Sequence, residues 1–458
     1  EAGRIEYRDA LVVDAAGRRA SLTNGLGDGE VELRVPDAFL DQARFPIMVD
    51  PLVQVITAAS NTLDHANPDA VYDQAADVWL VVCEEVVAAN DHDIRCDRFR
   101  GSGSFLETVY FENGPDDARE PAIAAAVARS RAIVVWLQNN VVVGNVRNPA
   151  SPLGPTAAPS FIGPGANFSP ALGGDSGSSG RCLVTFGQGG LSGNTSLLAQ
   201  VCNVGSFTIQ NVGNPVSLDP INACHSRAAV SRDCKGGSWL VAWSSRCSPG
   251  GTFFAAVDSA TAGVTQPKTA IPNPGLDDHP TVAGDGVGEW VVAWERDLTV
   301  DKDIFGSVVR NTGGAYVASA SVDLTLLEPG TAATADQTEP AIAFDGCRYA
   351  YAYLEAAARG SVRAATLRVL GGAPVFDEGH VPLSSAVATQ SATAMAARAE
   401  GAGAPTDYLV CWRQKPLLGA IGSIQAALYQ GHDPGPQSQI VATGCPSAGA
   451  PTIAFSGA

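Results

Sequence analysis

Polar and ionisable residues recur just before short apolar segments of the sequence, usually next to a proline. These positions hold His65, Asn67, Glu120, His225, His279 and Glu339. Two imidazoles and a carboxylate can bind a transition metal and leave open positions for a substrate. His225, His279 and Glu339 are therefore candidate metal ligands, and either histidine could instead transfer protons. The competing interpretation is structural, because a polar residue before a proline can end a turn and face water.

A second pattern places two aspartates two residues apart, in DHDI at residues 91–94 and in DKDI at residues 301–304. Hard oxygen ligands at this spacing suit calcium. Asp91, Asp93, Asp301 and Asp303 are thus candidate calcium ligands, and calcium is the cofactor that the sequence suggests. Neither segment matches the EF-hand pattern, so the alternative is that an aspartate accepts backbone N–H bonds and fixes a turn.

The chain has ten cysteines and no CxxC pair, which argues against a zinc ribbon. An even number in an acidic chain favours disulfides and an oxidising compartment. The preferred pairs, each flanking a predicted hairpin, are Cys83–Cys96, Cys182–Cys202 and Cys224–Cys247. Partners for Cys234, Cys347, Cys411 and Cys445 stay open, with Cys411–Cys445 as one option.

The elements that position these residues repeat along the chain. Each copy has a short strand, a Gly/Asp-rich turn, a strongly apolar strand ending in a large side chain, and two weaker strands. The anchors that end the apolar strands are Cys83, Trp136, Phe186, Trp243, Trp294, Tyr353 and Trp412, spaced 50 to 59 residues apart. Four strands per period are what one blade of a β-propeller requires. The sequence therefore predicts an all-β, seven-bladed β-propeller over residues 52–458, with eight blades, the last incomplete, as the alternative.

Aromatic residues stand four apart in several of these apolar strands, as in Trp239/Trp243 and Trp290/Trp294. In a strand this spacing puts both rings on one face. Since the rings lie in the most apolar strand of each copy, we expect them to pack between sheets. The alternative is a platform on which a sugar stacks.

Residues 279–308 carry the repeat best, as x-P-x-V-A-x-D-G-x-G-x-W-V-V-A-W-E followed by D-x-D-I-x-G. This pattern resembles propeller repeats in large secreted bacterial proteins, and the resemblance implies a fold but no activity. Residues 1–51 lie outside the repeat and are predicted to form a small N-terminal β segment. That segment looks like the closing piece of a β-rich domain that precedes repeat regions in such proteins. The final APTIAFSGA would close the ring or begin an eighth blade.

In a propeller the first strand of each blade lines the central channel. The six polar residues are therefore predicted to gather near the channel mouth. The aspartate pairs are predicted on the same face of the ring, where the second and third strands connect.

The formal net charge is −18 and lysine occurs only four times. Such a surface repels phosphate backbones, so we expect no nucleic-acid partner. No apolar run reaches the ~20 residues of a membrane-spanning helix. The chain begins at Glu1 without a signal peptide, and we expect a mature or excised part of a secreted or cell-surface protein.

No nucleophile elbow, zinc-protease motif or P-loop is present in the sequence. The sequence thus favours a non-enzymatic extracellular module that binds a glycan, a protein partner or copies of itself. The rival is a secreted hydrolase or lyase acting on polysaccharide, with a metal or acid/base site at the channel mouth.

Overall fold

The computed structural model describes most of the repeat region and parts of the segment before it. The described residues are 11–14, 19–21, 23–27, 30–44, 47–50, 53–59 and 63–430, the last range without 151–157, 164–165, 176–179, 190–194, 224, 232–236, 246–249, 326–334, 347, 357–359, 385–387, 399–406 and 417–420. The segment APTIAFSGA and the pair Cys224–Cys247 lie outside these residues.

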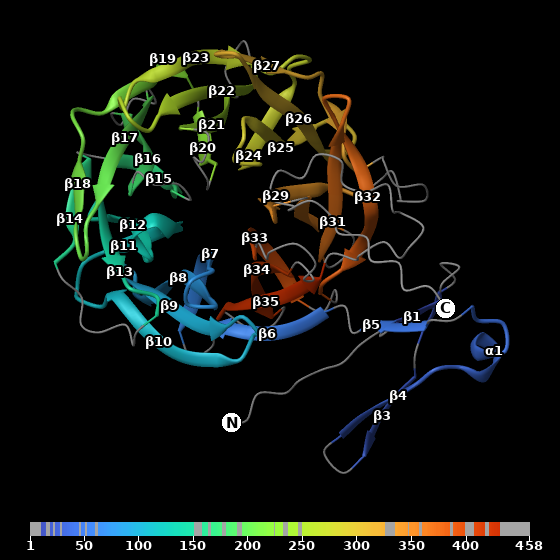
Figure 1. Cartoon of the computed structure of the whole chain (residues 1–458). Coiled ribbons are helices and arrows are strands. Elements are labelled where there is room, and N and C mark those ends of the chain that lie inside the picture. The colour runs from blue at the N-terminus through green and yellow to red at the C-terminus, as the bar shows by residue number, and fades with distance from the viewer. Residues whose placement is uncertain are drawn as a thin grey trace, which may run out of the picture.

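Seven antiparallel sheets stand around a central channel, which confirms the predicted seven-bladed propeller (Figure 1). Blade 1 consists of β7 (Asp64–Asp73), β8 (Val78–Ala88), β9 (Asp91–Arg100) and β10 (Phe105–Glu112). Blade 2 consists of β11 (Ala118–Ala126), β12 (Arg131–Gln138), β13 (Val141–Arg147) and β14 (Ser160–Gly163). Blade 3 consists of β15 (Ala166–Gly173), β16 (Arg181–Gly189), β17 (Thr195–Val204), β18 (Ile209–Asn211) and β19 (Val216–Ala223).

The remaining blades follow the same order from the channel outward. Blade 4 consists of β20 (His225–Val230), β21 (Ser238–Ser245), β22 (Gly251–Asp258) and β23 (Val264–Ala270). Blade 5 consists of β24 (Leu276–Gly284), β25 (Glu289–Asp297), β26 (Lys302–Thr312), β27 (Ala315–Ala318) and β28 (Val322–Asp323). Blade 6 consists of β29 (Gln337–Phe344), β30 (Tyr349–Glu355), β31 (Ser361–Leu370) and β32 (Ala373–Pro382). Blade 7 takes β33 (Ala388–Ala397), β34 (Asp407–Pro416) and β35 (Ser423–Gln430) from the end of the described chain.

The fourth strand of blade 7 comes from the other end of the chain. It is β6 (Val53–Ala59), which pairs antiparallel with β35 from Tyr429↔Val53 to Ile424↔Ala59. The polypeptide before blade 1 thus completes the last blade and closes the ring (Figure 1). The predicted propeller range of 52–458 includes β6, but the sequence did not indicate this partner.

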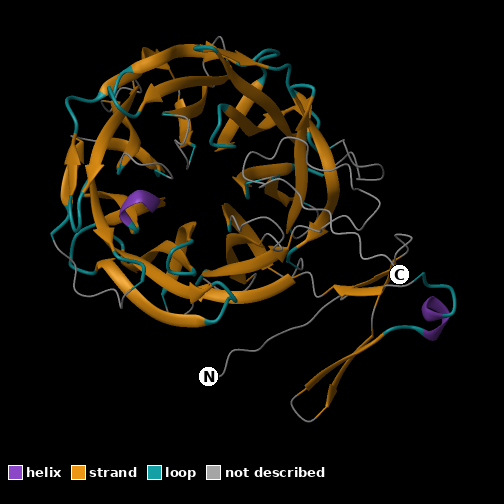
Figure 2. Ribbon diagram, viewed as in Figure 1, coloured by secondary structure: helices purple, strands orange, loops and turns teal. Residues whose placement is uncertain are grey.

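The described strands before β6 lie outside the ring in Figure 1. They form a sheet of β1 (Leu11–Asp14), β2 (Arg19–Ser21) and β5 (Ile47–Asp50), a hairpin of β3 (Thr23–Gly27) and β4 (Glu30–Arg34), and the short helix α1 (Asp37–Leu40). Figure 2 shows how little helix the described chain contains. None of its helices is long and apolar enough to cross a membrane.

The hydrophobic core consists of seven clusters, each shared by two neighbouring blades of the described chain. Side chains of a strand alternate between the two faces of its sheet, so each apolar second strand feeds two clusters. All seven anchors are buried, with exposed fractions of at most 1%. The prediction that the repeated aromatics pack between sheets is therefore confirmed, and none of these anchors forms an exposed stacking platform.

Candidate binding site at the channel mouth

The first strand of every blade has a break in register at the same place, close to the channel mouth. Five non-glycine residues at these breaks have φ between 45° and 54°, namely Asn67, Glu120, His279, Glu339 and Ala392. The left-handed region costs roughly 1 kcal/mol or more for such residues, and backbone strain of this kind often accompanies binding sites. Each bulge re-aims the side chain that an uninterrupted strand would place elsewhere.

Blade 4 corrects one prediction. In blade 5, His279 lies two residues before the residue that pairs with Ala293, the neighbour of the anchor. In blade 4, Ala229 pairs with Ala242, which is the neighbour of the anchor. The residue two positions before Ala229 is Arg227 and not His225. The predicted equivalence of His225 with His279 is therefore wrong by two residues. A guanidinium occupies the place expected for the second imidazole, and its charge opposes a metal ion.

The bulge residues surround a cavity of about 440 Å³ at the channel mouth. Asn67, Glu120, Arg227, His279 and Glu339 contribute polar side chains to its lining. Arg227 Nη2 lies 3.4 Å from Asn67 Oδ1, so a hydrogen bond reaches from blade 4 to blade 1. Four of the six predicted channel-mouth residues therefore line one site, namely Asn67, Glu120, His279 and Glu339.

A buried glutamate of blade 1 holds two of these residues in place. Glu84 is 5% exposed and follows the anchor of β8. Its Oε2 accepts from Asn67 Nδ2 at 2.9 Å and from the backbone N–H of Glu120 at 3.1 Å. Its Oε1 lies 2.7 Å from Nδ1 of His92. The carboxylate therefore joins the bulges of blades 1 and 2.

Blade 5 repeats this arrangement with Glu295, which is 2% exposed. Its Oε2 lies 3.1 Å from His279 Nδ1 and 3.4 Å from the backbone nitrogen of Glu339, and its Oε1 lies 2.5 Å from Lys302 Nζ. Burial alone would raise the pKa of Glu295, but the bonds from His279 and Lys302 outweigh it and lower the pKa to about 2. Sequence reasoning missed Glu84 and Glu295, although each directly follows an anchor.

The two glutamates of the mouth differ in their partners. Glu339 Oε2 accepts from the backbone N–H of Ala392 in blade 7. Glu120 Oε2 is buried and has no hydrogen-bond partner among the described residues. A buried carboxylate oxygen without a donor is costly, so Glu120 is the mouth residue most ready to accept from a ligand.

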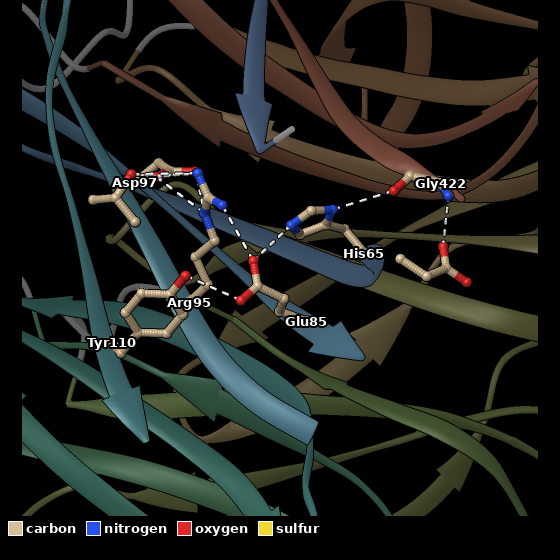
Figure 3. A network of polar contacts seen from close by, with 8 residues as sticks. His65, Glu85, Arg95, Asp97, Tyr110 and Gly422 are labelled. Atoms are coloured by element: carbon tan, nitrogen blue, oxygen red, sulfur yellow. Dashed lines mark hydrogen bonds and ion pairs between the residues drawn. The ribbon is translucent and has the colours of Figure 1, made fainter. Parts of the chain in front are cut away.

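His65 does not line the channel, contrary to the prediction. It is fully buried between blade 1 and blade 7, with Nδ1 3.2 Å from the carbonyl oxygen of Gly422 and Nε2 3.0 Å from Glu85 Oε1 (Figure 3). Glu85 Oε2 also accepts from Tyr110 at 3.0 Å, and Arg95 joins the same carboxylate. His65 therefore belongs to a buried polar network, which we call the seam network.

In blade 5, Asp303 of the predicted calcium pair has a hydrogen-bond partner within the same blade. Asp303 is 7% exposed and shares a hydrogen bond with Asp323 of the outer strand. Burial, followed by the charges of Asp323 and Asp301, raises the pKa of Asp303 to about 7. Within the described residues, no three His, Cys, Asp or Glu side chains are placed to ligate one metal ion together. The side chain of His225 lies outside the described part of the chain, so the transition-metal set of His225, His279 and Glu339 stays a prediction, although Arg227 and not His225 is at the position equivalent to His279.

Replacing Asp303 with asparagine should stabilise the protein at pH 8 and not at pH 4. A raised carboxyl pKa means that the folded state keeps a proton that the unfolded chain loses, so stability falls as the pH rises from about 4 to 7. Asparagine removes that loss, and we expect a gain of about 1–3 kcal/mol at pH 8. Denaturant unfolding at the two pH values, in EDTA, measures it, and an equal difference at both would contradict the shared proton.

The structure contradicts two predicted disulfides. Cys83 pairs in register with Arg95, and Cys96 pairs with Val82, so the two thiols face different interblade cores and are free. Cys182 and Cys202 stand directly opposite each other. They nevertheless form no disulfide, and Cys202 Sγ lies 3.4 Å from Asn211 Oδ1. Burial raises the pKa of the Cys83 and Cys96 thiols, which makes them poor nucleophiles.

No protein-family model matches the sequence, and no curated protein matches it either. Solved structures of similar shape include the NanB sialidase of Streptococcus pneumoniae, with 10% identity, a TM-score of 0.43, and coverage of 88% of this chain and 73% of that one. The Aleuria aurantia lectin has 11% identity, a TM-score of 0.38, and coverage of 72% and 98%. The β-propeller domain of the Trilobed protease of Pyrococcus furiosus has 7% identity, a TM-score of 0.44, and coverage of 81% and 99%. These values are too low for any of their functions to carry over.

Proposed function

We propose that this propeller is a non-enzymatic binding module that holds a sugar residue of a glycan at the channel mouth. The observation that carries the proposal is the buried, unpartnered Oε2 of Glu120 in a polar cavity of about 440 Å³. Binding sites for small molecules typically have volumes of roughly 300–1,000 Å³. The cavity therefore has room for a small polar ligand.

The chemistry of the lining favours a hydroxyl-rich ligand. Arg227 and Asn67 bring hydrogen-bond donors, and Glu120 brings an acceptor, to one cavity. A sugar hydroxyl both donates and accepts, so it can use a ring of mixed partners. Since no Phe, Tyr or Trp of the described residues lines this cavity, recognition would depend on hydrogen bonds and not on stacking.

The same contacts favour binding over hydrolysis. Glycosidases use two carboxyl groups with separate roles, one as an acid and one as a base or nucleophile. Here Glu339 already accepts from the backbone of Ala392, and His279 is held by Glu295. Asp69, the other carboxylate of the lining, accepts from the backbone N–H groups of Ala70 and Ile123. Both described carboxylates that could assist Glu120 in this cavity are thus held by backbone N–H groups.

A glycan array followed by calorimetry on the best ligand tests the proposal. Arg227→Ala and Glu120→Gln should each weaken binding by about tenfold or more, because each removes a charged hydrogen-bond partner. Arg310→Ala is the matched control, because Arg310 pairs with Glu289 at the opposite end of blade 5. This variant should bind the glycan with unchanged affinity.

Two results would overturn this assignment. Unchanged glycan affinity in both mouth variants would place the binding site elsewhere. Release of new sugar ends by the intact protein, lost in Glu120→Gln, would instead support the polysaccharide hydrolase or lyase alternative.

A further inference from the structure

Blade 1 gathers three carboxylates at the end of the blade that carries the channel mouth. Asp91 and Asp93 lie at the start of β9, and Glu112 lies at the end of β10, where it pairs in register with Ile94. The three side chains thus come from two hydrogen-bonded strands. Asp93 also stands opposite Glu85 of β8, so negative groups face it from both neighbouring strands.

Each member of this group has an oxygen that the protein leaves without a partner. Asp91 Oδ1, Asp93 Oδ1 and Glu112 Oε2 are all buried and accept no hydrogen bond from the described residues. The whole Asp93 residue is only 8% exposed. An unpaired buried carboxylate is strongly unfavourable, so it requires either a proton or a cation.

The surrounding charges favour a cation. Asp93 stands opposite Glu85 of β8, and Asp91 and Glu112 lie on the two strands β9 and β10 beside it. A nitrogen of the His92 ring lies 2.7 Å from Glu84. Asp93 thus has carboxylates as neighbours, and a cation would offset their mutual repulsion.

We propose that blade 1 binds one calcium ion through Asp91 and Asp93, with Glu112 beside them. The donors are all oxygens, which suits calcium better than a transition metal. Calcium accepts a flexible shell, so two carboxylate side chains suffice if backbone carbonyls and water complete it. Glu112 is not counted as a third ligand, because no three such side chains of the described residues are placed to ligate one ion together.

Blade 5 has the same D-x-D spacing but a different environment. Asp303 shares a hydrogen bond with Asp323, and Asp323 Oδ1 accepts from Thr325 Oγ1 at 2.7 Å. Its carboxyl groups are thus partnered by the chain itself. We therefore expect each chain to bind one calcium ion, in blade 1 and not in blade 5.

Calcium titration of the EDTA-stripped, full-length chain at pH 7.5 tests the inference by calorimetry and thermal unfolding. The intact protein should bind one calcium ion and gain at least about 3 °C in Tm at saturation. Asp93→Asn should bind calcium at least about tenfold more weakly, because it loses a charged ligand. Asp303→Asn, the matched control in blade 5, should still bind one ion with unchanged affinity.

A lack of calcium binding by the intact protein, binding of two ions, or unchanged affinity in Asp93→Asn would overturn the inference. If a variant binds no calcium, its melting temperature in EDTA at pH 8 provides a second test. There, Asp93→Asn should melt at or above the temperature of the intact protein, because it removes repulsion. A lower melting temperature would show that the unpartnered carboxylate is not a source of strain, and would also count against the site.

Discussion

Glu85→Gln is expected to lower the free energy of unfolding by about 3–5 kcal/mol, the usual cost of breaking a buried ion pair. Glu85 is 2% exposed and accepts from His65, Arg95 and Tyr110 at 3.0–3.2 Å. Both ring nitrogens of His65 lie within hydrogen-bond distance of oxygen atoms. Arg95 lies between Glu85 and Asp97 and bonds to both carboxylates. Without the charge of Glu85, the buried guanidinium of Arg95 loses one of these two carboxylate partners.

The effect should be large because the network joins the two ends of the ring. His65 belongs to blade 1 and contacts Gly422, in the turn before β35 of blade 7. In the same seam, Arg413 pairs with Asp64 at 2.7 Å. Weakening this contact therefore loosens the junction between the first and last blades.

Two variants in the same blade calibrate the measurement. Tyr110→Phe removes one hydrogen bond to Glu85 and should cost about 1 kcal/mol. Glu107→Gln removes a more exposed pair with Arg98 and should cost less than about 1 kcal/mol. Urea unfolding at pH 7 compares them. If Glu85→Gln proves as mild as Glu107→Gln, the seam network does not stabilise the ring.

The periodic features of this fold could be predicted from the sequence, since they follow from burial. The apolar second strands and anchors such as Trp243 and Trp294 recur because each blade must fill the same interblade core. Their spacing was enough to predict seven blades. The small polar core could not be predicted in this way, because Glu84 and Glu295 sit in apolar strands and have partners from other blades.

The errors arise where one residue decides the register. A bulge adds a residue to one strand, so period-two counting fails there. Blades 5 and 6 mark the bulge with a proline after His279 and Glu339, but blade 4 has Ala228 at that place. Because blade 4 lacks this proline, the sequence pattern aligned His225 with His279 in place of Arg227. Alignment of RAAV (residues 227–230) with HPTV (residues 279–282), counted back from the anchor, places Arg227 opposite His279.

The prediction of a Cys83–Cys96 disulfide failed for a related reason, whereas Cys182 and Cys202 do share a register position and still form no disulfide. Two cysteines that flank a hairpin are close along the chain, but this does not determine on which face of the sheet each side chain lies. Cys83 and Cys96 are one position out of register, which turns their side chains to opposite sides of the sheet. A free thiol is also a small apolar side chain, and these cysteines fill the core as such.

Removal of residues 1–60 should destabilise the propeller by roughly 3–6 kcal/mol, whereas removal of residues 1–50 should have little effect on the ring. The longer deletion takes away β6 and its six register pairs with β35, and net backbone hydrogen bonds contribute about 1 kcal/mol each. It also removes Ala58, which is 2% exposed in the core between blades 7 and 1. Strand β35 would then become an open edge, which favours association with other chains.

The two truncated chains differ mainly by the closing strand, so each is the control for the other in thermal unfolding. A synthetic peptide of residues 51–60 added to the longer deletion should restore part of the lost Tm in a concentration-dependent way, because it can refill the edge of blade 7. Equal destabilisation by both deletions would mean that the segment before β6 supports the ring. An unchanged Tm in both would mean that three strands suffice for blade 7, and that closure depends on the seam network of His65 and Glu85 alone.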